Sequence, residues 1–287
     1  MTRGVALLGA VCIAAACVSL EVSEGWDVVH EGSLHWEAAG RGEHQIVLLH
    51  GGGLDLHQWD DEFDWLRQRH LVLRYDQRGH GRSQVPSEPF APHEDLRELL
   101  ERRGFDPPVL VAHSNGGRVA IDFALLHPER VAGLFLLAPG LSGWSADQAE
   151  LDAWLQPILA AVEQGDRERV LELWLASPSF AAARENPDAE PKLERLMRAN
   201  VETWFQEPNE LPLDPPAADC LSDLTLPVRV LVGRRDAPEF LRIAEAIRAH
   251  VPNAQIVWVE DAGHALNLER PDVVRNELER FLDDLRW

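Results

Sequence analysis

Short apolar runs alternate with helical patterns along most of the chain. Unbroken apolar runs, which are typical of strands buried on both faces, occur at 46–49, 71–75, 109–112, 131–138, 228–232 and 255–259. Two weaker strand patterns precede them, at 26–30 and 34–38, with Glu31-Gly32-Ser33 between. A turn sequence between two strand patterns predicts a hairpin at the start of the sheet.

Helical periodicity fills the gaps between the apolar runs. The expected helices cover 96–103, 116–127, 239–250 and 271 to about 286. Pro128 ends the second of these and Pro271 suits the first turn of the last, because proline lacks the N–H that a helix interior needs. Alternating strands and helices predict an α/β fold with a doubly wound, mostly parallel sheet of about eight strands.

The alternation stops between residues 141 and 223. Helical patterns continue there at 147–163, 167–176 and 192–206, and Asp214-Pro215-Pro216 closes the stretch. We therefore expect a helical insertion at 141–223, after the sixth strand. The core domain would then consist of 26–140 and 224–287.

The segment from Val109 to Ala120 carries the strongest chemical signal. A buried strand runs into a helix through Ala112-His113-Ser114-Asn115-Gly116. This pattern is close to G-x-S-x-G, in which a strained turn exposes the serine hydroxyl at the edge of the sheet. Ala112 replaces the first glycine. The helix that follows favours negative charge at its N-terminus, so Ser114 is the candidate nucleophile.

A second strand ends in glycines, at His50-Gly51-Gly52-Gly53. Glycines allow backbone N–H groups to approach a substrate oxygen closely. We expect the N–H groups of Gly52 and Asn115 to form an oxyanion hole, with Gly53 as the alternative to Gly52. Each such donor contributes roughly 3–4 kcal/mol in the transition state. His50 is expected to brace this loop.

Two further polar residues follow the last two strands. Asp236 comes just after the run at 228–232, and His264 comes just after the run at 255–259. Strand carboxyl ends meet at one edge of a parallel sheet, so both residues can reach Ser114. The order Ser, Asp, His along the chain is that of one serine-hydrolase fold and differs from the others.

With these motifs, the sequence resembles the α/β-hydrolase superfamily over residues 26–287. The segment 74–83, RYDQRGHGRS, is similar to the D-x-R-G-x-G-x-S stretch of the family's esterase-like, peroxidase-like and iminopeptidase-like branches. The chain as a whole resembles the esterase-like, lactonase-like and perhydrolase-like branch that has a helical cap. The resemblance implies that Asp76 and Arg78 hold loops together and that 141–223 is a helical cap over the active site. Trp59 belongs to the loop and helix that follow the oxyanion glycines in the family.

The resemblance also implies a mechanism. Ser114 attacks an acyl carbonyl, His264 is the base, Asp236 orients the base, and water hydrolyses the acyl-enzyme. This chemistry needs no cofactor and no metal. A Ser nucleophile argues against the haloalkane dehalogenase and epoxide hydrolase branches, which use Asp. The expected activity is a serine esterase acting on a small-molecule carboxylic ester, lactone or thioester.

Other activities share the same three residues. Aminopeptidase, carbon–carbon hydrolase and perhydrolase reactions stay open, as do acyl transfer and a catalytically silent protein that binds a ligand or partner. An aminopeptidase needs acidic cap residues for a substrate amine, and Glu202 and Glu207 are available, although cap helices carry many acids. The substrate pocket is expected to include Leu54, Trp59, Trp144 and Leu266.

Charge and cysteine content narrow the partners. The chain has 27 Lys and Arg against 48 Asp and Glu, a formal net charge of −21. Such a surface repels phosphate backbones and disfavours anionic lipid, which excludes nucleic acid as a partner. Two of the three cysteines lie in the first 17 residues, so Cys220 alone remains in the body and predicts neither disulfides nor zinc.

The N-terminus has the pattern of an export signal. Arg3 precedes an apolar run at 5–16, which is too short to span a bilayer and ends in Ala14-Ala15-Ala16. Cleavage after residue 16 would release a periplasmic or extracellular protein. Alternatively, Cys17 would be lipidated and anchor the protein to a membrane. A cytoplasmic enzyme with a short apolar extension is the remaining alternative.

Overall fold

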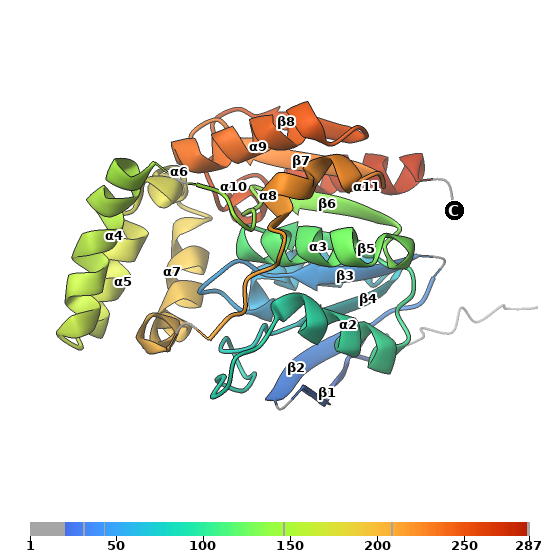
Figure 1. The fold of residues 1–287 in the computed structure, drawn as a ribbon, viewed down its shortest axis with the longest axis horizontal. Coiled ribbons are helices and arrows are strands. Elements are labelled where there is room, and N and C mark those ends of the chain that lie inside the picture. The colour runs from blue at the N-terminus through green and yellow to red at the C-terminus, as the bar shows by residue number, and fades with distance from the viewer. Residues whose placement is uncertain (1–20, 31, 43, 146, 208, 286–287) are drawn as a thin grey trace, which may run out of the picture.

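Eight strands of the described residues form one sheet. The computed structural model describes residues 21–285 except 31, 43, 146 and 208 (Figure 1). Along the sheet the strands follow the order β1-β2-β4-β3-β5-β6-β7-β8. Their bounds are β1 Ser23–Val29, β2 Gly32–Ala39, β3 Gln45–Leu49, β4 Leu71–Tyr75, β5 Val109–His113, β6 Gly133–Leu137, β7 Val228–Gly233 and β8 Ala254–Val259.

The pairing confirms a mostly parallel sheet. β1 and β2 form the expected hairpin, and β2 pairs antiparallel with β4. From β4 to β8 every pairing is parallel, with registers such as Val47 opposite Leu110 and Val111 opposite Phe135. Every residue of β5, β6 and β7 is buried, which explains why these strands are mostly apolar; the exception within β7 is Arg229, whose guanidinium is hydrogen-bonded to Gln255 and Asp284. The run at 255–259, expected to be buried on both faces, instead forms the edge strand β8, most of which is only partly buried.

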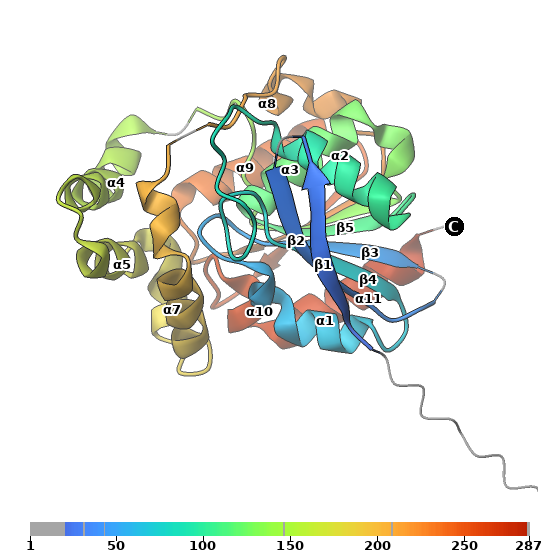
Figure 2. The ribbon, with the colours of Figure 1, turned by 90° about the horizontal axis from the view of Figure 1, so that it is seen from below.

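Helices cover both faces of the sheet (Figures 1 and 2). On one face, α2 (Pro92–Arg103), α3 (Asn115–Leu126) and α9 (Pro238–His250) pack their apolar sides against it. On the other face lie α1 (Asp60–Leu66), α10 (Leu266–Glu269) and α11 (Pro271–Asp284). This arrangement confirms the doubly wound architecture, and it leaves the carboxyl ends of the parallel strands at one edge.

Further helices lie between β6 and β7 in the sequence. They are α4 (Gln148–Glu163), α5 (Arg167–Leu175), α6 (Ala181–Arg184), α7 (Glu190–Ala199) and α8 (Ala217–Cys220). Short 3-10 turns join them, including η3 (Pro178–Phe180) and η4 (Val201–Phe205). We call α4 to η4, residues 148–205, the cover. Its buried side chains form their own cluster, which includes Leu54, Ala265 and Leu268 from the sheet domain.

The expected helix at 192–206 is wrong at both ends. α7 begins at Glu190 and ends at Ala199, and η4 follows. Asn200 leaves the helical conformation (φ −113°, ψ 14°), and its side chain donates a hydrogen bond to Asp55 and accepts one from Gly81 N–H. Contacts with the sheet domain therefore stop the helix, and a periodic pattern does not show such contacts.

After η4 the chain returns along the loop that follows β4. Phe90 N–H donates to Asn209 C=O and Leu211 N–H donates to Phe90 C=O, which makes an isolated parallel bridge. No helix of the described residues is long and apolar enough to cross a bilayer. The expected signal at 1–16 and the lipidation site Cys17 lie outside the described residues.

Candidate active site

Ser114 lies in a strained turn between β5 and α3. Its φ is 50° and its ψ is −114°, a conformation that costs a non-glycine residue energy. A Cβ on Gly116 would lie 2.5 Å from the carbonyl oxygen of His50, so only glycine fits two residues after the serine. Ala112, which replaces the first glycine of the pattern, is buried in the core, where its methyl group packs.

The side chains of Ser114, His264 and Asp236 form a continuous hydrogen-bonded row. His264 Nε2 lies 2.9 Å from Ser114 Oγ, and His264 Nδ1 lies 2.8 Å from Asp236 Oδ2. Asp236 Oδ1 accepts the N–H of Ala237 at 2.7 Å. Burial raises the pKa of the Asp236 carboxyl, and the nearby His264 opposes that rise. A carboxylate at Nδ1 selects the tautomer that leaves Nε2 free to accept a proton.

The backbone around His264 is held from several directions. Its N–H donates to Ser179 C=O of the cover at 3.1 Å, and His113 Nε2 lies 3.0 Å from its carbonyl oxygen. The buried carboxylate of Glu269 accepts the N–H groups of Gly263 and Ala265, at 2.7 and 2.9 Å. Burial raises the pKa of the Glu269 carboxyl, and these two N–H groups lower it.

In the glycine loop after β3, two of the three N–H groups are already hydrogen-bonded. Gly51 N–H donates to Gln58 Oε1, and Gly53 N–H donates to His80 Nε2 at 3.0 Å. Among the hydrogen bonds between described residues, none uses the N–H of Gly52 or Asn115. A Cβ on Gly52 would lie 3.5 Å from Asn115 Cβ, so the two residues adjoin. This geometry disfavours Gly53 as a donor, since its N–H is already used.

The tautomer of His80 supports the same conclusion. His80 Nδ1 lies 3.0 Å from the carbonyl oxygen of Arg78 and must donate to it, which leaves Nε2 to accept the N–H of Gly53. Burial lowers the pKa of the His80 imidazole, so the ring favours this neutral form.

A cavity of about 540 Å³ opens beside Gly52 and Asn115. Trp174 and Trp204 of the cover form part of its wall, with ring centroids 5.4 Å apart in an edge-to-face arrangement. The other lining residues are Gly53, Arg78, His80, Pro86, Phe90, Thr203, Gln206, Glu207, Asn209 and Glu210. The cavity thus combines apolar rings with polar groups, as small-molecule sites do.

The four residues expected in the pocket lie elsewhere. Trp59 and Leu266 are fully buried in the core beneath the site, and Leu54 is buried where the cover meets the sheet domain. Trp144 is half-buried and packs against the other face of the sheet. None of these four residues lines the cavity beside Gly52, because apolar side chains next to a motif pack in the core as readily as in a pocket.

The residues expected to brace the loops do so. His50 Nε2 accepts the N–H of Gln77, and burial lowers the pKa of His50 to about 3, so the ring stays neutral. Asp76 accepts hydrogen bonds from the N–H groups of Leu56 and Arg82. Arg78 forms a buried ion pair with Asp95. These contacts tie the segment 74–83 to its neighbours, and they lie outside the row of Ser114, His264 and Asp236.

The two acids considered for a substrate amine differ in position. Glu202 is exposed and pairs with Arg167 on the surface of the cover. Glu207 lines the cavity beside Trp204. Glu207 alone of these two is therefore placed to meet a ligand.

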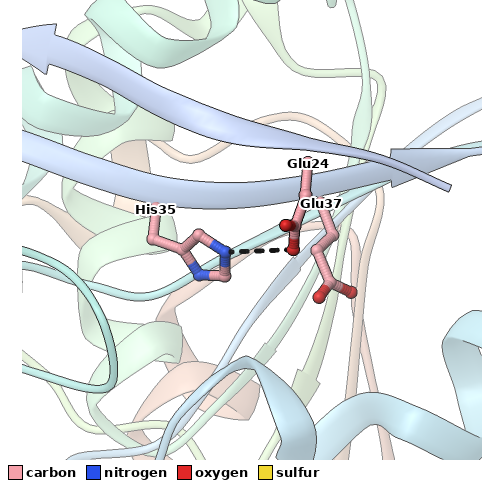
Figure 3. A group of neighbouring side chains, drawn as sticks. All are labelled: Glu24, His35 and Glu37. Atoms are coloured by element: carbon pink, nitrogen blue, oxygen red, sulfur yellow. Dashed lines mark ion pairs between the residues drawn. The ribbon is translucent and has the colours of Figure 1, made fainter.

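Figure 3 shows a separate group, Glu24, His35 and Glu37, whose ligand-type atoms lie within 4.8 Å of one another. Arginines already use these atoms. Arg82 Nη1 lies 3.0 Å from His35 Nε2 and 3.3 Å from Glu24, while Arg74 pairs with Glu37 at 2.6 Å. The guanidinium groups supply the positive charge that a metal ion would bring, so this group is a structural ion-pair cluster.

Sequence reasoning missed three residues that surround the site. His113 precedes Ser114, Glu269 follows His264 by five residues, and Trp174 comes from the cover. His113 and Glu269 sit next to motif residues, so their position was a usable signal. No signal in the sequence links Trp174 to Gly53, although a Cβ on Gly53 would lie 1.9 Å from its ring.

Known proteins resemble this chain over most of its length. A pimeloyl-acyl-carrier-protein methyl ester esterase of Aliivibrio salmonicida is 27% identical over 259 residues, which cover 87% of this chain and 96% of that protein. The crystal structure of a hydrolase from Pseudomonas aeruginosa is 26% identical with a TM-score of 0.74, covering 90% of this chain and 98% of that one.

A structure of Est816, described as an N-acyl homoserine lactone degrading enzyme, has a TM-score of 0.72 at 23% identity and covers 89% of this chain and 99% of that one. A likeness at that identity shows the fold. The model of the alpha/beta hydrolase family matches residues 46–277, from the start of β3 to within α11. The chain is a hydrolase and belongs to the alpha/beta hydrolase family.

Proposed function

We propose that this hydrolase cleaves small-molecule carboxylic esters through an acyl-enzyme on Ser114. The observation that carries the proposal is the row of hydrogen bonds, 2.9 Å from Ser114 Oγ to His264 Nε2 and 2.8 Å from His264 Nδ1 to Asp236. A hydroxyl, a base and a carboxylate in that order are the arrangement that activates a serine nucleophile.

Each residue then has a defined role. His264 Nε2 takes the proton of Ser114 as Oγ attacks the ester carbonyl, and the oxyanion receives the N–H groups of Gly52 and Asn115. His264 returns the proton to the leaving alcohol, and the same steps with water release the acid. Asp236 stabilises the imidazolium that forms in between.

The cavity beside Gly52 supports a small-molecule substrate. Its volume of about 540 Å³ lies within the usual range for such sites. Similar proteins include a methyl ester esterase and a lactone-degrading enzyme, so esters and lactones are the first substrates to test. We propose that 141–223 acts as a cap that shapes this cavity, since Trp174 and Trp204 form its wall.

The test is labelling with a fluorophosphonate, followed by peptide mapping, alongside turnover of p-nitrophenyl acetate, butyrate and octanoate. We expect label on Ser114, ester turnover, and neither in Ser114→Ala. The chain-length preference then measures the usable depth of the cavity. Folded wild-type protein that neither reacts nor turns over would contradict the proposal and favour a silent binding protein.

An aminopeptidase reaction is the second candidate, because Glu207 lines the cavity and offers a negative charge to a substrate amine. Aminoacyl p-nitroanilides test it directly. Turnover that exceeds ester turnover and falls in Glu207→Gln would favour the peptidase. Acyl transfer and perhydrolase activity are tested by adding alcohols, amines or hydrogen peroxide and analysing the products.

We also propose that the chain is exported. The apolar run at 5–16 and the alanines before Cys17 support this. Mass spectrometry of the protein from bacterial cells separates the alternatives: cleavage after Ala16 without modification, a diacylglyceryl group on Cys17, or a cytoplasmic enzyme that keeps the segment 5–16.

A further inference from the structure

A buried amide side chain joins three loops of the site. Gln58 lies on the 3-10 turn η1 (Leu56–Trp59) and is 2% exposed. Its Oε1 accepts the N–H of Gly51 at 2.9 Å, and its Nε2 lies 2.9 Å from His113 Nδ1 and 3.1 Å from Asn267 Oδ1. None of these contacts belongs to the row of Ser114, His264 and Asp236.

The donors and acceptors of this network fit only one assignment. A carbonyl oxygen can only accept, so His113 Nε2 carries the hydrogen that it donates to His264 C=O. His113 Nδ1 must then accept, and the amide nitrogen of Gln58 must donate to it. Burial lowers the pKa of His113 well below its usual range, in agreement with a neutral ring. If the Gln58 amide were flipped, its NH2 group would face the N–H of Gly51, and two donors would oppose each other.

The residues that Gln58 holds are direct neighbours of the reacting groups. Gly51 precedes Gly52, the proposed oxyanion donor, and His113 precedes Ser114. Through His113 the chain of bonds reaches the carbonyl of His264, the proposed base. The packing is close, since a Cβ on Gly51 would lie 2.5 Å from His113 Nδ1.

From this geometry we propose that Gln58 is a positioning residue, which sets the place of the oxyanion donor relative to the base. The inference rests on the proposed function above. The oxyanion loop and the His264 loop are more than 200 residues apart in the sequence. Gln58 and His113 connect them through three hydrogen bonds. Because a displacement of about 1 Å can cost roughly 100-fold in rate, such a link affects the chemical step.

Gln58→Glu tests the link with almost unchanged shape. The introduced carboxyl can still accept the N–H of Gly51, and once ionised it no longer donates to His113 Nδ1, so kcat is measured at pH 8 to 9. His113 Nδ1 must then carry a hydrogen to donate to the carboxylate. If the ring stays neutral, Nε2 loses its hydrogen and its lone pair faces the carbonyl oxygen of His264. If Nε2 keeps its hydrogen, the buried ring is charged. We expect kcat to fall by about 10- to 100-fold while KM stays within about twofold.

Two readouts separate positioning from simple destabilisation. The first is kcat per active site, with the sites counted by fluorophosphonate titration, which removes any unfolded fraction. The second is inhibition by an alkyl boronic acid, which forms a tetrahedral adduct on the serine. Its inhibition constant should rise by the same factor by which kcat/KM falls.

Arg229→Met is the matched control. Arg229 is buried and hydrogen-bonded to Gln255 and Asp284, but it lies near the amino end of β7, at the opposite edge of the sheet. We expect it to lower the melting temperature without changing kcat per titrated site. A Gln58→Glu protein that behaves like this control, with wild-type kcat per site, overturns the inference.

One measurement on the wild-type protein does not depend on any variant folding. The ¹⁵N chemical shifts of His113 should show the neutral tautomer with hydrogen on Nε2, and a charged ring or the other tautomer overturns the inference. The proposed function fails differently, because wild-type protein would then show no Ser114 labelling and no turnover at all.

Discussion

The loops at the carboxyl edge and the cover above them are held by different kinds of contact. Around His264 and Gly51 the contacts are buried hydrogen bonds, many of them to backbone N–H or C=O groups. The cover also has buried contacts with the sheet domain, such as Asn200 with Asp55, but in addition it carries many exposed ion pairs. Examples are Arg167 with Glu202, Arg198 with Glu168, Lys192 with Asp61 and Arg242 with Glu150.

The difference separates two tasks. Buried hydrogen bonds fix groups in place without reorganisation during reaction, which suits the proposed oxyanion donor and the proposed base. Exposed ion pairs contribute little and weaken with salt, so they fix the cover less firmly. We therefore expect changes at the buried edge to alter rate, and changes in the exposed pairs of the cover to alter rate little.

The largest effect is expected for Asp236→Asn, at the centre of the buried edge. The amide can donate to His264 Nδ1 and so favours the tautomer with hydrogen on Nε2, which cannot take the proton of Ser114. We expect kcat to fall by about 10⁴-fold with the fold retained. Turnover and the circular dichroism spectrum measure this. Near wild-type activity would show that another acid orients His264.

A smaller loss is expected when the support of the base loop is weakened. In Glu269→Gln one of the N–H groups of Gly263 and Ala265 loses its acceptor and faces an amide NH2 instead. We expect kcat to fall by about 10- to 100-fold. Glu277→Gln, in a partly exposed ion pair on α11, is the control and should leave kcat unchanged. Equal kcat in the two variants would contradict the idea that the buried support of the His264 loop affects the rate.

The buried edge should also make stability depend on pH. Glu62 is not one of the proposed catalytic residues. Its carboxyl accepts a hydrogen bond from Asn267, which also contacts Gln58. Burial raises the pKa of the Glu62 carboxyl to about 7. A raised folded-state pKa means that its stabilising effect is complete below the unfolded value of about 4.5 and is lost as pH rises through about 7. The loss is on the order of 3 kcal/mol.

Urea unfolding at pH 5, 6, 7 and 8 measures that loss. Glu62→Gln should flatten the decline between pH 5 and 8 and be more stable than wild type at pH 8. If stability fell with pH equally in wild type and in Glu62→Gln, Glu62 would be charged in the folded state. That result would contradict a raised pKa for this carboxyl.

The smallest effect is expected in the cover. Lys192→Gln removes the exposed pair that joins α7 to Asp61 of α1. We expect kcat/KM to change by less than about fivefold, and the difference from wild type to vanish in about 0.5 M salt. A larger, salt-independent loss would show that the cover is held as firmly as the edge beneath it.

Much of this architecture follows from the sequence, for a physical reason. Strands buried on both faces are largely apolar, so 109–112 and 228–232 mark β5 and β7 almost to the residue, although β7 also holds the buried Arg229. Ser114 and Asp236 follow these two strands, and His264 follows β8, the partly buried edge strand. A parallel sheet brings its strand ends together at one edge. The strand pattern therefore suffices to predict that these three side chains lie close to one another.

The cavity could not be predicted in the same way. Whether an apolar side chain faces a cavity or the core depends on contacts between distant segments, so the sequence does not distinguish Trp59 and Leu266 from Trp174 and Trp204. The use of Gly53 N–H by His80 is another such contact, between residues 27 positions apart. Periodicity also missed the end of α7, because the Asn200 side chain is hydrogen-bonded to Asp55 and to the N–H of Gly81, outside the helix.

The indole of Trp174 on Gly53 has a consequence for how this protein can change over generations. Gly53 has φ +66°, and even a methyl group there would overlap the ring at 1.9 Å. A side chain at 53 meets two obstacles, the indole and a backbone conformation that glycine alone adopts without strain, and a smaller residue at 174 removes only the first. The mutational path to a wider binding site therefore runs through position 174, and a library that randomises 174 while keeping glycine at 53 samples that path.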